Sequence, residues 1–209
     1  MLLLRRRLNK FTGKDRHSIR LKDYNYSWPG FYFVTICVKD KECCLGKIIE
    51  FNNSFDGPIV KLTKLGEIVK DIWWSIPKHH QMTEIDEFII MPNHLHGIII
   101  INNGRGDARN VNNGRGDARI APTRDFKKQP SGSLATIIGS FKSEVSKQIH
   151  FLDGWEGFTW QRNYYEHIIR NEISLDKIRN YIIDNPRKWQ DDIENPNNNF
   201  NQKTSKRLL

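Results

Sequence analysis

The stretch MPNHLHGIIII, Met91–Ile101, decides how the fold is interpreted. Two runs rich in β-branched residues, Ile85–Met91 and His94–Ile101, each have the composition of a strand. Only Pro92-Asn93 separates them, and this dipeptide is a turn signal. Because so short a connection returns the chain alongside itself, the two strands are expected to form an antiparallel hairpin.

Two histidines begin the second of these strands. His94 and His96 are two positions apart, so in a strand their imidazoles point to the same face and can chelate one cation. The rest of the strand is apolar, and burying two imidazoles beside it has a desolvation cost that a metal or a phosphate would offset. The spacing alone is equally compatible with two structural histidines, because His-x-His occurs in many unrelated folds.

Strand and helix signals alternate around this hairpin. Three segments have apolar residues close to every 3.6 positions, and short β-branched or aromatic runs mark the strands. An order of strand, helix, hairpin, helix and short strand indicates an α+β protein, best accommodated by a ferredoxin-like antiparallel sheet with helices on one face and a C-terminal helix. The other expected elements are strands at Phe31–Val38, Leu45–Phe51 and Phe158–Tyr165, and helices over residues 62–76, over residues 133–149 and ending near Asn185.

Composition divides the chain into three parts. Residues 1–16 form a basic N-terminal extension, and residues 17–190 carry the strand and helix signals of a single domain. Residues 191–209 form a polar, asparagine-rich C-terminal tail. Since such a tail has little apolar surface to bury, we expect it to be frayed beyond Asn195-Pro196.

The domain is interrupted by an insert with an internal repeat. The octapeptide NNGRGDAR at residues 102–109 recurs letter for letter at residues 112–119. The surrounding stretch is rich in glycine and polar residues and has no helical or strand periodicity. Residues 102–132 are therefore expected to be a flexible excursion between two elements of the core.

The balance of charge points to a polyanionic partner. Lys and Arg number 33 against 24 Asp and Glu, a net charge of +9, which favours nucleic acid first and an anionic membrane surface second. Three cysteines, Cys37, Cys43 and Cys44, make neither a disulfide framework nor a thiolate zinc site. The apolar N-terminal residues are too few for a signal peptide and no segment approaches membrane-spanning length, so we expect a cytoplasmic protein.

The last helix carries a second candidate site. Tyr181 and Asn185 are four residues apart and therefore lie on one helical face. Tyr181 lies at the edge of an apolar stripe, which places its hydroxyl near the boundary of the domain, and Asn185, just before Pro186, offers an amide oxygen as a hard ligand. Periodicity alone favours a simpler interpretation, a core tyrosine and a capping asparagine. The stripe consists of Leu175, Ile178 and Ile182.

Aromatic and basic residues gather before and after this helix. Rings for base stacking and cations for phosphates are what a site for single-stranded nucleic acid needs. Trp160 and one of the tyrosines can equally well belong to the core. The candidate DNA contacts, on spacing alone, are Arg162, Tyr164, Tyr165, Arg170, Arg187 and Lys188.

Three segments together resemble the single-tyrosine HUH (histidine-hydrophobic-histidine) transposases, and among them the REP-associated tyrosine transposases. They are MPNHLHGIIII at Met91–Ile101, WQRNYYEHIIRNE at Trp160–Glu172 and YIIDNPRKW at Tyr181–Trp189, in the order that the family has them. The resemblance spans roughly residues 17–190. Asn185 stands where the insertion-sequence enzymes have Gln, which points to the REP-associated branch, whereas the repeat at 102–119 is not a recognised family feature.

The resemblance implies a role for each candidate residue. His94, His96 and Asn185 would hold one Mg²⁺ or Mn²⁺, and Tyr181, on a C-terminal catalytic helix, would be the nucleophile. The implied activity is cutting and rejoining of single-stranded DNA near the hairpin of a palindromic repeat, through a 5′-phosphotyrosine intermediate. Members of the family act as monomers or as homodimers.

Three alternatives remain open at the level of sequence. Tyr164 and Tyr165 are rival nucleophiles, ranked below Tyr181 because neither has a ligand-type residue four positions on. The chain can also be a non-catalytic domain that binds single-stranded nucleic acid, with structural histidines. Lastly, it can be a metal-dependent phosphodiesterase in which His94 and His96 serve a water nucleophile and no covalent adduct forms.

Overall fold

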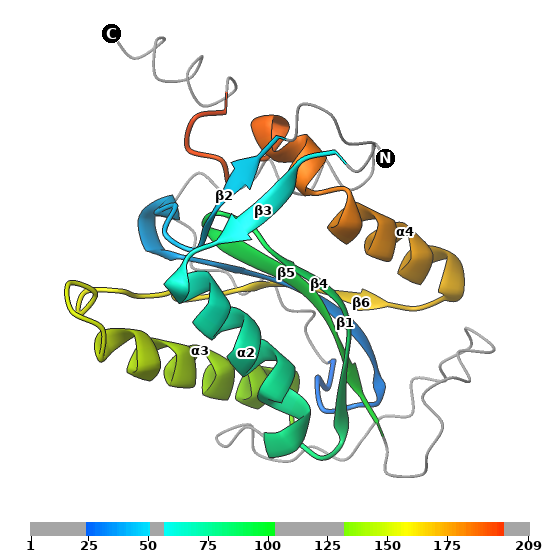
Figure 1. Cartoon of the computed structure of the whole chain (residues 1–209). Coiled ribbons are helices and arrows are strands. Elements are labelled where there is room, and N and C mark those ends of the chain that lie inside the picture. Colours follow the sequence, from blue (N-terminus) through cyan, green and yellow to red (C-terminus); the bar gives the residue numbers. More distant parts are fainter. Residues whose placement is uncertain (1–23, 51–56, 103–131, 199–209) are drawn as a thin grey trace, which may run out of the picture.

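The computed structural model describes residues 24–50, 57–102 and 132–198 (Figure 1). The expected N-terminal extension, most of the repeat-containing insert and the end of the tail lie outside the described residues. No helix in the described ranges is long and apolar enough to cross a membrane. The strands are β1 (Gly30–Cys37), β2 (Gly46–Ile49), β3 (Ile59–Leu62), β4 (Thr83–Ile90), β5 (His94–Ile101) and β6 (Tyr165–Ile169), the helices are α2 (Lys64–His79), α3 (Leu134–His150) and α4 (Glu172–Ile183), and the short 3-10 helices are η1 (Lys39–Lys41) and η2 (Pro186–Asp191).

The main sheet has four strands in the order β4-β5-β1-β6, and β2 and β3 form a separate two-stranded sheet. Every neighbouring pair in the main sheet is antiparallel, which confirms the hairpin expected from Pro92-Asn93. Along β1, the register with β5 runs from Gly30 opposite Ile101 to Cys37 opposite His94. The two histidines therefore lie at one end of a strand that is hydrogen-bonded on both sides.

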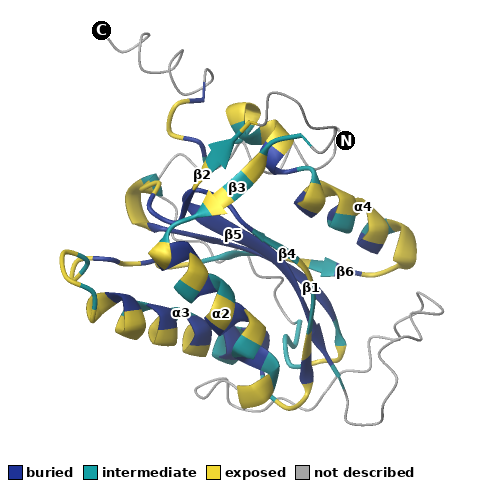
Figure 2. Ribbon diagram, in the orientation of Figure 1, coloured by how far each residue is buried: buried dark blue, intermediate teal, exposed yellow. Residues whose placement is uncertain are grey.

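Helices pack on both faces of this sheet. Side chains from β1 and β5 alternate between the faces, as the period of a strand requires. Tyr32, Val34 and Ile99 belong to the core under α2 and α3, whereas Phe33 and Ile98 pack against the apolar stripe of α4. Figure 2 shows the buried faces of all three helices turned toward the buried central strands. The α+β fold class with an antiparallel sheet is confirmed.

Gly97 fixes how closely α2 approaches the strand that carries the histidines. A Cβ atom at this position would lie 2.4 Å from Cζ2 of Trp73, a fully buried side chain of α2. Only glycine leaves room for the indole ring at that distance. His96 precedes Gly97, so packing on the α2 face holds the backbone of β5, while the imidazole of His96 stacks on Phe33 on the α4 face.

Two elements differ from the sequence expectation. The strand β3 (Ile59–Leu62) was not expected, because its four residues gave too short a signal ahead of the helix. The aromatic run Phe158–Tyr165 was expected to be a strand, but only an isolated bridge joins Trp160 to Val38, and β6 begins at Tyr165. The ladder with β1 extends over the residues from Tyr165 to Ile169, where side chains alternate between the two covered faces.

Candidate metal and tyrosine site

The imidazoles of His94 and His96 face one another at the end of β5. Their Nε2 atoms are 3.0 Å apart, and both side chains are buried on the α4 face of the sheet. Burial lowers the pKa of His96 to about 3. Burial, the neighbouring His96 and Lys41 lower the pKa of His94 well below its usual value. Both rings are therefore neutral at physiological pH, the form in which imidazole binds a metal.

Asn93 determines which nitrogen of His94 carries the proton. The Asn93 amide group donates to the carbonyl oxygens of Lys41 (3.0 Å) and Glu194 (2.7 Å), so its own oxygen faces Nδ1 of His94 at 2.8 Å. An amide oxygen only accepts hydrogen bonds, so Nδ1 of His94 is the donor. The lone pair on Nε2 of His94 is consequently directed toward His96.

Thr35 holds the second ring. Its hydroxyl lies 2.8 Å from Nδ1 of His96, the residue directly opposite in the ladder between β1 and β5, and the imidazole stacks on Phe33. Without a cation, the short contact between the two Nε2 atoms needs a proton on His96, because the proton of His94 is on Nδ1. A hydroxyl both donates and accepts, so Thr35 allows that proton to move to Nδ1 when Nε2 becomes a ligand.

Tyr181 places its hydroxyl beside this pair. The oxygen is 3.4 Å from Nε2 of His96, too long for a strong hydrogen bond, and the ring meets Phe33 edge-on. Burial raises the pKa of the Tyr181 hydroxyl to about 12, with a further contribution from Asp192, while a hydrogen bond from Asn185 acts in the opposite direction. The residue is nevertheless 42% exposed, so part of its ring is accessible from solvent.

Asn185 contributes an unsatisfied oxygen. The residue follows the end of α4 and is only 1% exposed. Within the described part of the chain, its side-chain Oδ1 has no hydrogen-bond partner. A buried carbonyl oxygen without a hydrogen-bond partner destabilises the fold by about 1–3 kcal/mol. A ligand that binds this oxygen would remove that cost.

Asp192 is a site residue that the sequence reasoning missed. Its Oδ2 atom lies 3.9 Å from Nε2 of His94, and its side chain is 8% exposed. One ligand atom each from His94, His96 and Asp192 lie within 4.8 Å of one another, so these three residues can hold a metal ion. Burial raises the pKa of Asp192 to about 6, with Glu194 adding to the shift and a backbone hydrogen bond and Lys41 opposing it.

The segment that carries Asp192 is fastened to the domain. Lys41 Nζ donates to the carbonyl oxygen of Ile193 at 2.7 Å. The side-chain amides of Asn195 and Asn198 donate to the carbonyl oxygens of Trp189 (2.9 Å) and Asp192 (2.7 Å). The expectation that the chain frays beyond Asn195-Pro196 is wrong for Asn197 and Asn198, because asparagine side chains form hydrogen bonds with the backbone there and Asn198 is buried.

The pair of histidines fits a divalent cation geometrically. In an octahedral site, two nitrogens on adjacent positions, each about 2.1 Å from the ion, are about 3.0 Å apart. The Nε2 atoms of His94 and His96 have this separation. Neutral imidazoles, a buried carboxylate and an unsatisfied amide oxygen are all metal-ligand types. The phenol of Tyr181 therefore lies next to a candidate cation site.

The candidate DNA-contact residues are distributed over several elements. Tyr165 packs on the α4 face, where Tyr181 also lies, whereas Tyr164 packs against the core on the opposite face. The side chain of Lys188 pairs with Asp184 at 3.1 Å. The three arginines named as candidates are Arg162, Arg170 and Arg187, and all are exposed.

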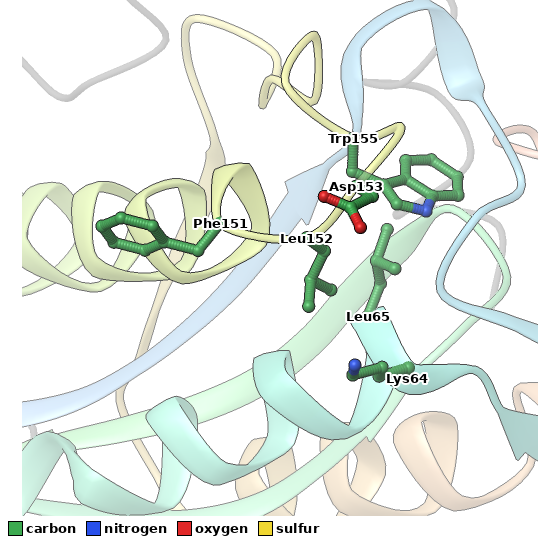
Figure 3. A pocket seen from close by; sticks show the side chains of 6 residues that line it. All are labelled: Lys64, Leu65, Phe151, Leu152, Asp153 and Trp155. Carbon is green, nitrogen blue, oxygen red and sulfur yellow. The ribbon is translucent and has the colours of Figure 1, made fainter.

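A hollow elsewhere on the surface does not belong to this site. Figure 3 shows it where α2 begins and α3 ends. None of the histidine, tyrosine, asparagine or aspartate residues described above lines it. Its lining consists of Lys64, Leu65, Phe151, Leu152, Asp153 and Trp155.

The chain is similar in sequence to one known protein and in fold to another. No family model matches the chain. An uncharacterized protein of Haemophilus influenzae is 42% identical over 182 residues, which cover 85% of this chain and 91% of that protein. The solved structure of a REP-associated tyrosine transposase bound to a REP hairpin aligns with a TM-score of 0.51 at 16% identity, over 82% of this chain and 74% of that chain. The chain therefore belongs to the same family as the Haemophilus influenzae protein, and it has the fold of the REP-associated tyrosine transposases.

Proposed function

We propose that this protein is a single-tyrosine HUH transposase of the REP-associated kind, which cuts and rejoins single-stranded DNA at hairpins formed by palindromic repeats. One observation carries the proposal: the hydroxyl of Tyr181 lies 3.4 Å from Nε2 of His96, within the same buried cluster as His94. The fold supports it, since the solved relative with this fold is a transposase bound to a REP hairpin.

The proposed cofactor is Mg²⁺ or Mn²⁺, held by His94, His96 and the amide oxygen of Asn185. Magnesium prefers oxygen ligands, so two imidazoles favour manganese. Bound there, the cation would lower the pKa of a nearby phenol and neutralise charge on the phosphoryl oxygens. Among the residues that the structure describes, Oδ1 of Asn185 has no hydrogen-bond partner, which supports its inclusion.

Tyr181 is the proposed nucleophile. Its phenol proton passes to water, and the phenolate oxygen attacks the phosphorus of the scissile phosphodiester. A bond forms between the tyrosine oxygen and phosphorus, and the bond from phosphorus to the 3′ oxygen breaks. The leaving oxygen takes a proton from water and becomes a 3′-hydroxyl, while the 5′-phosphate stays on Tyr181. Rejoining is the reverse displacement by another 3′-hydroxyl, so it needs no energy source.

The proposed DNA path uses the exposed cations and the nearby tyrosines. Arg162, Arg170 and Arg187 are exposed and, with Lys188, can neutralise phosphates, while Tyr165 lies on the same face of the sheet as Tyr181. Tyr164 packs against the core under α2 and α3, on the opposite face from Tyr181, so it is a weaker candidate both for base stacking and for the nucleophile. We propose residues 17–190 as the catalytic domain.

A single chain supplies every side chain of the proposed site. His94 and His96 come from β5, and Tyr181 comes from α4 of the same chain. A monomer can therefore assemble the site in cis, although a homodimer that leaves these contacts intact is equally compatible with it. Cross-linking or sedimentation of the active protein distinguishes these two states.

A covalent-adduct assay tests the proposed function. The protein is incubated in Mn²⁺ with single-stranded hairpin DNA labelled at its 3′ end, because the downstream fragment is the one that stays on the tyrosine, and is analysed on a denaturing gel. We expect a labelled protein band that disappears with chelator and with Tyr181→Phe but remains with Tyr165→Phe, which removes the hydroxyl of the rival nucleophile and keeps the ring that can stack on a base. Metal-dependent cleavage without any adduct would instead indicate a phosphodiesterase that uses water, and metal-independent binding alone would indicate a non-catalytic domain.

A further inference from the structure

We propose that Asp192 is a protein ligand of the divalent cation, in addition to His94, His96 and Asn185. The segment Asp192–Asn198, named here the C-terminal strap, delivers its carboxylate. The inference rests on the proposed function, because that function places a cation at the histidine pair. It goes further, since the resemblance to transposases accounts for the two histidines and Asn185 alone.

The position of the carboxylate is the first argument. Oδ1 of Asp192 accepts a hydrogen bond from the backbone N–H of Glu194 at 2.7 Å, which orients the group and directs Oδ2 toward the histidines. Oδ2 lies 3.9 Å from Nε2 of His94. This distance is too long for a hydrogen bond. A cation between the two atoms satisfies both of them.

The balance of charge is the second argument. The imidazoles of His94 and His96 and the amide of Asn185 bring no negative charge to the site. The carboxylate of Glu194 faces Lys41 at 3.6 Å, whereas that of Asp192 faces the histidines. Burial of a carboxylate without a cationic partner is unfavourable, and coordination of a divalent cation offsets that cost.

Asn185 brings a second oxygen donor to the same place. Its Oδ1 is buried and, in the ranges that the structure describes, has no hydrogen-bond partner. The residue lies at the start of η2, the short helix that ends at Asp191, directly before Asp192. The end of α4 and the beginning of the strap therefore each bring an oxygen donor toward the nitrogens of β5.

The strap is held from several sides, so the carboxylate is positioned before a metal binds. Asn93 donates to the carbonyl oxygen of Glu194, and Lys41 donates to that of Ile193. Within the strap, the side chain of Asn198 returns to the carbonyl oxygen of Asp192. Asn93 also orients His94, so a single buried side chain aligns one nitrogen ligand and the strap that carries the oxygen ligand.

The test measures Mn²⁺ binding to the full-length protein without DNA, by calorimetry and by the electron paramagnetic resonance signal of free Mn²⁺. Asp192→Asn keeps the shape of the side chain and the oxygen that accepts from Glu194, but it removes the charge. We expect this variant to raise the Kd for Mn²⁺ by about tenfold or more. The matched control is Asp191→Asn, at the exposed neighbouring position, and its Kd should stay within about twofold of wild type.

A second variant keeps the test valid if Asp192→Asn does not fold. Asp192→Ser lacks the carboxylate, but serine also forms the local turn hydrogen bond to the N–H two residues on. It should weaken Mn²⁺ binding to a similar extent. Circular dichroism and the metal-free Tm identify which variants are folded.

The outcomes separate the inference from the proposed function. Wild-type binding that is lost in His96→Ala and weakened in Asp192→Asn supports both. Binding that is lost in His96→Ala but unchanged in folded Asp192→Asn or Asp192→Ser overturns the role of Asp192 and leaves the histidine site intact. No binding by the wild type, or binding that is insensitive to His96→Ala, overturns both.

Discussion

Arg179 of α4 and Asp86 of β4 are joined by two parallel hydrogen bonds. Nε donates to Oδ1 at 3.0 Å and Nη2 donates to Oδ2 at 2.6 Å. Asp86 lies where the register between β4 and β5 shifts, and such an irregularity can redirect a side chain from an edge strand. Arg179 is two residues before Tyr181, so this bidentate pair helps to hold the tyrosine-bearing helix on the sheet.

Loss of this pair is expected to slow the covalent step without affecting metal binding. Asp86→Asn removes the charge that holds Arg179, so α4 gains freedom and the hydroxyl of Tyr181 is positioned less well. We predict a several-fold slower single-turnover rate of adduct formation and an unchanged Kd for Mn²⁺. The exposed neighbour offers a control, Glu87→Gln, which should behave as wild type. An unaltered rate in Asp86→Asn would show that the pair does not position the helix.

The same pair predicts a pH dependence of stability. Burial raises the pKa of Asp86, but hydrogen bonds from Arg179 and from the Glu87 N–H outweigh it, so the net shift is downward from 3.8. A lowered pKa in the folded state means that the contribution is complete above about pH 4 and is lost as the pH falls through the folded value. In urea unfolding at pH 7, the free energy of unfolding of Asp86→Asn should be lower than that of wild type by about 1 kcal/mol or less. A difference that does not shrink below pH 4 would contradict this assignment.

Asn93 is expected to matter for metal binding although it is not a ligand. Asn93→Ala removes the acceptor that keeps the proton of His94 on Nδ1, and it releases one anchor of the strap. Loss of such a partner costs about 10–100-fold in metal affinity, and we predict a rise of that size in the Kd for Mn²⁺. Calorimetry measures the Kd, and Asn163→Ala, at an exposed position, is the control variant. Equal Kd values for the two variants would exclude a positioning role.

Two glycines should respond in opposite directions to replacement by alanine. At Gly97 the new Cβ would lie 2.4 Å from the Trp73 ring, so Gly97→Ala should lower the free energy of unfolding by about 1–3 kcal/mol. At Gly139, within α3, nothing lies within 4 Å of the new Cβ, so Gly139→Ala should raise it by up to about 1 kcal/mol. Denaturant titration of the two variants checks both signs, and a neutral Gly97→Ala would refute the proposed close packing.

The parts of the fold that could be predicted from the sequence depend on local patterns. The turn at Pro92-Asn93 and the isoleucine-rich strand determine the central hairpin, and helical periodicity located α2 and α3 to within a few residues. The start of β6 could not be found in this way, because Tyr164 and Tyr165 are equally good strand residues. What decides between them is the ladder with β1, a contact between residues far apart in the chain.

The residues of the candidate site also differ in whether a local sequence pattern could identify them. The spacing of His94 and His96 and the shared helical turn of Tyr181 and Asn185 made these residues candidates, and the resemblance to transposases gave them their proposed roles. Asp192 has no such pattern, because it lies in a polar, asparagine-rich stretch that reads as a solvated tail. Its proximity to the histidines is created by hydrogen bonds from Lys41 and Asn93, each more than 90 residues away in the chain, and no local pattern encodes these contacts.

Identification of the residue that carries the DNA tests the central claim most directly. The adduct formed with single-stranded hairpin DNA in Mn²⁺ is trimmed with nuclease, digested with protease and sequenced by mass spectrometry. The account predicts a 5′-linked nucleotide on Tyr181, at the position 3.4 Å from the histidine pair. A nucleotide on Tyr165 or Tyr164, or cleaved DNA with no modified peptide, would contradict it.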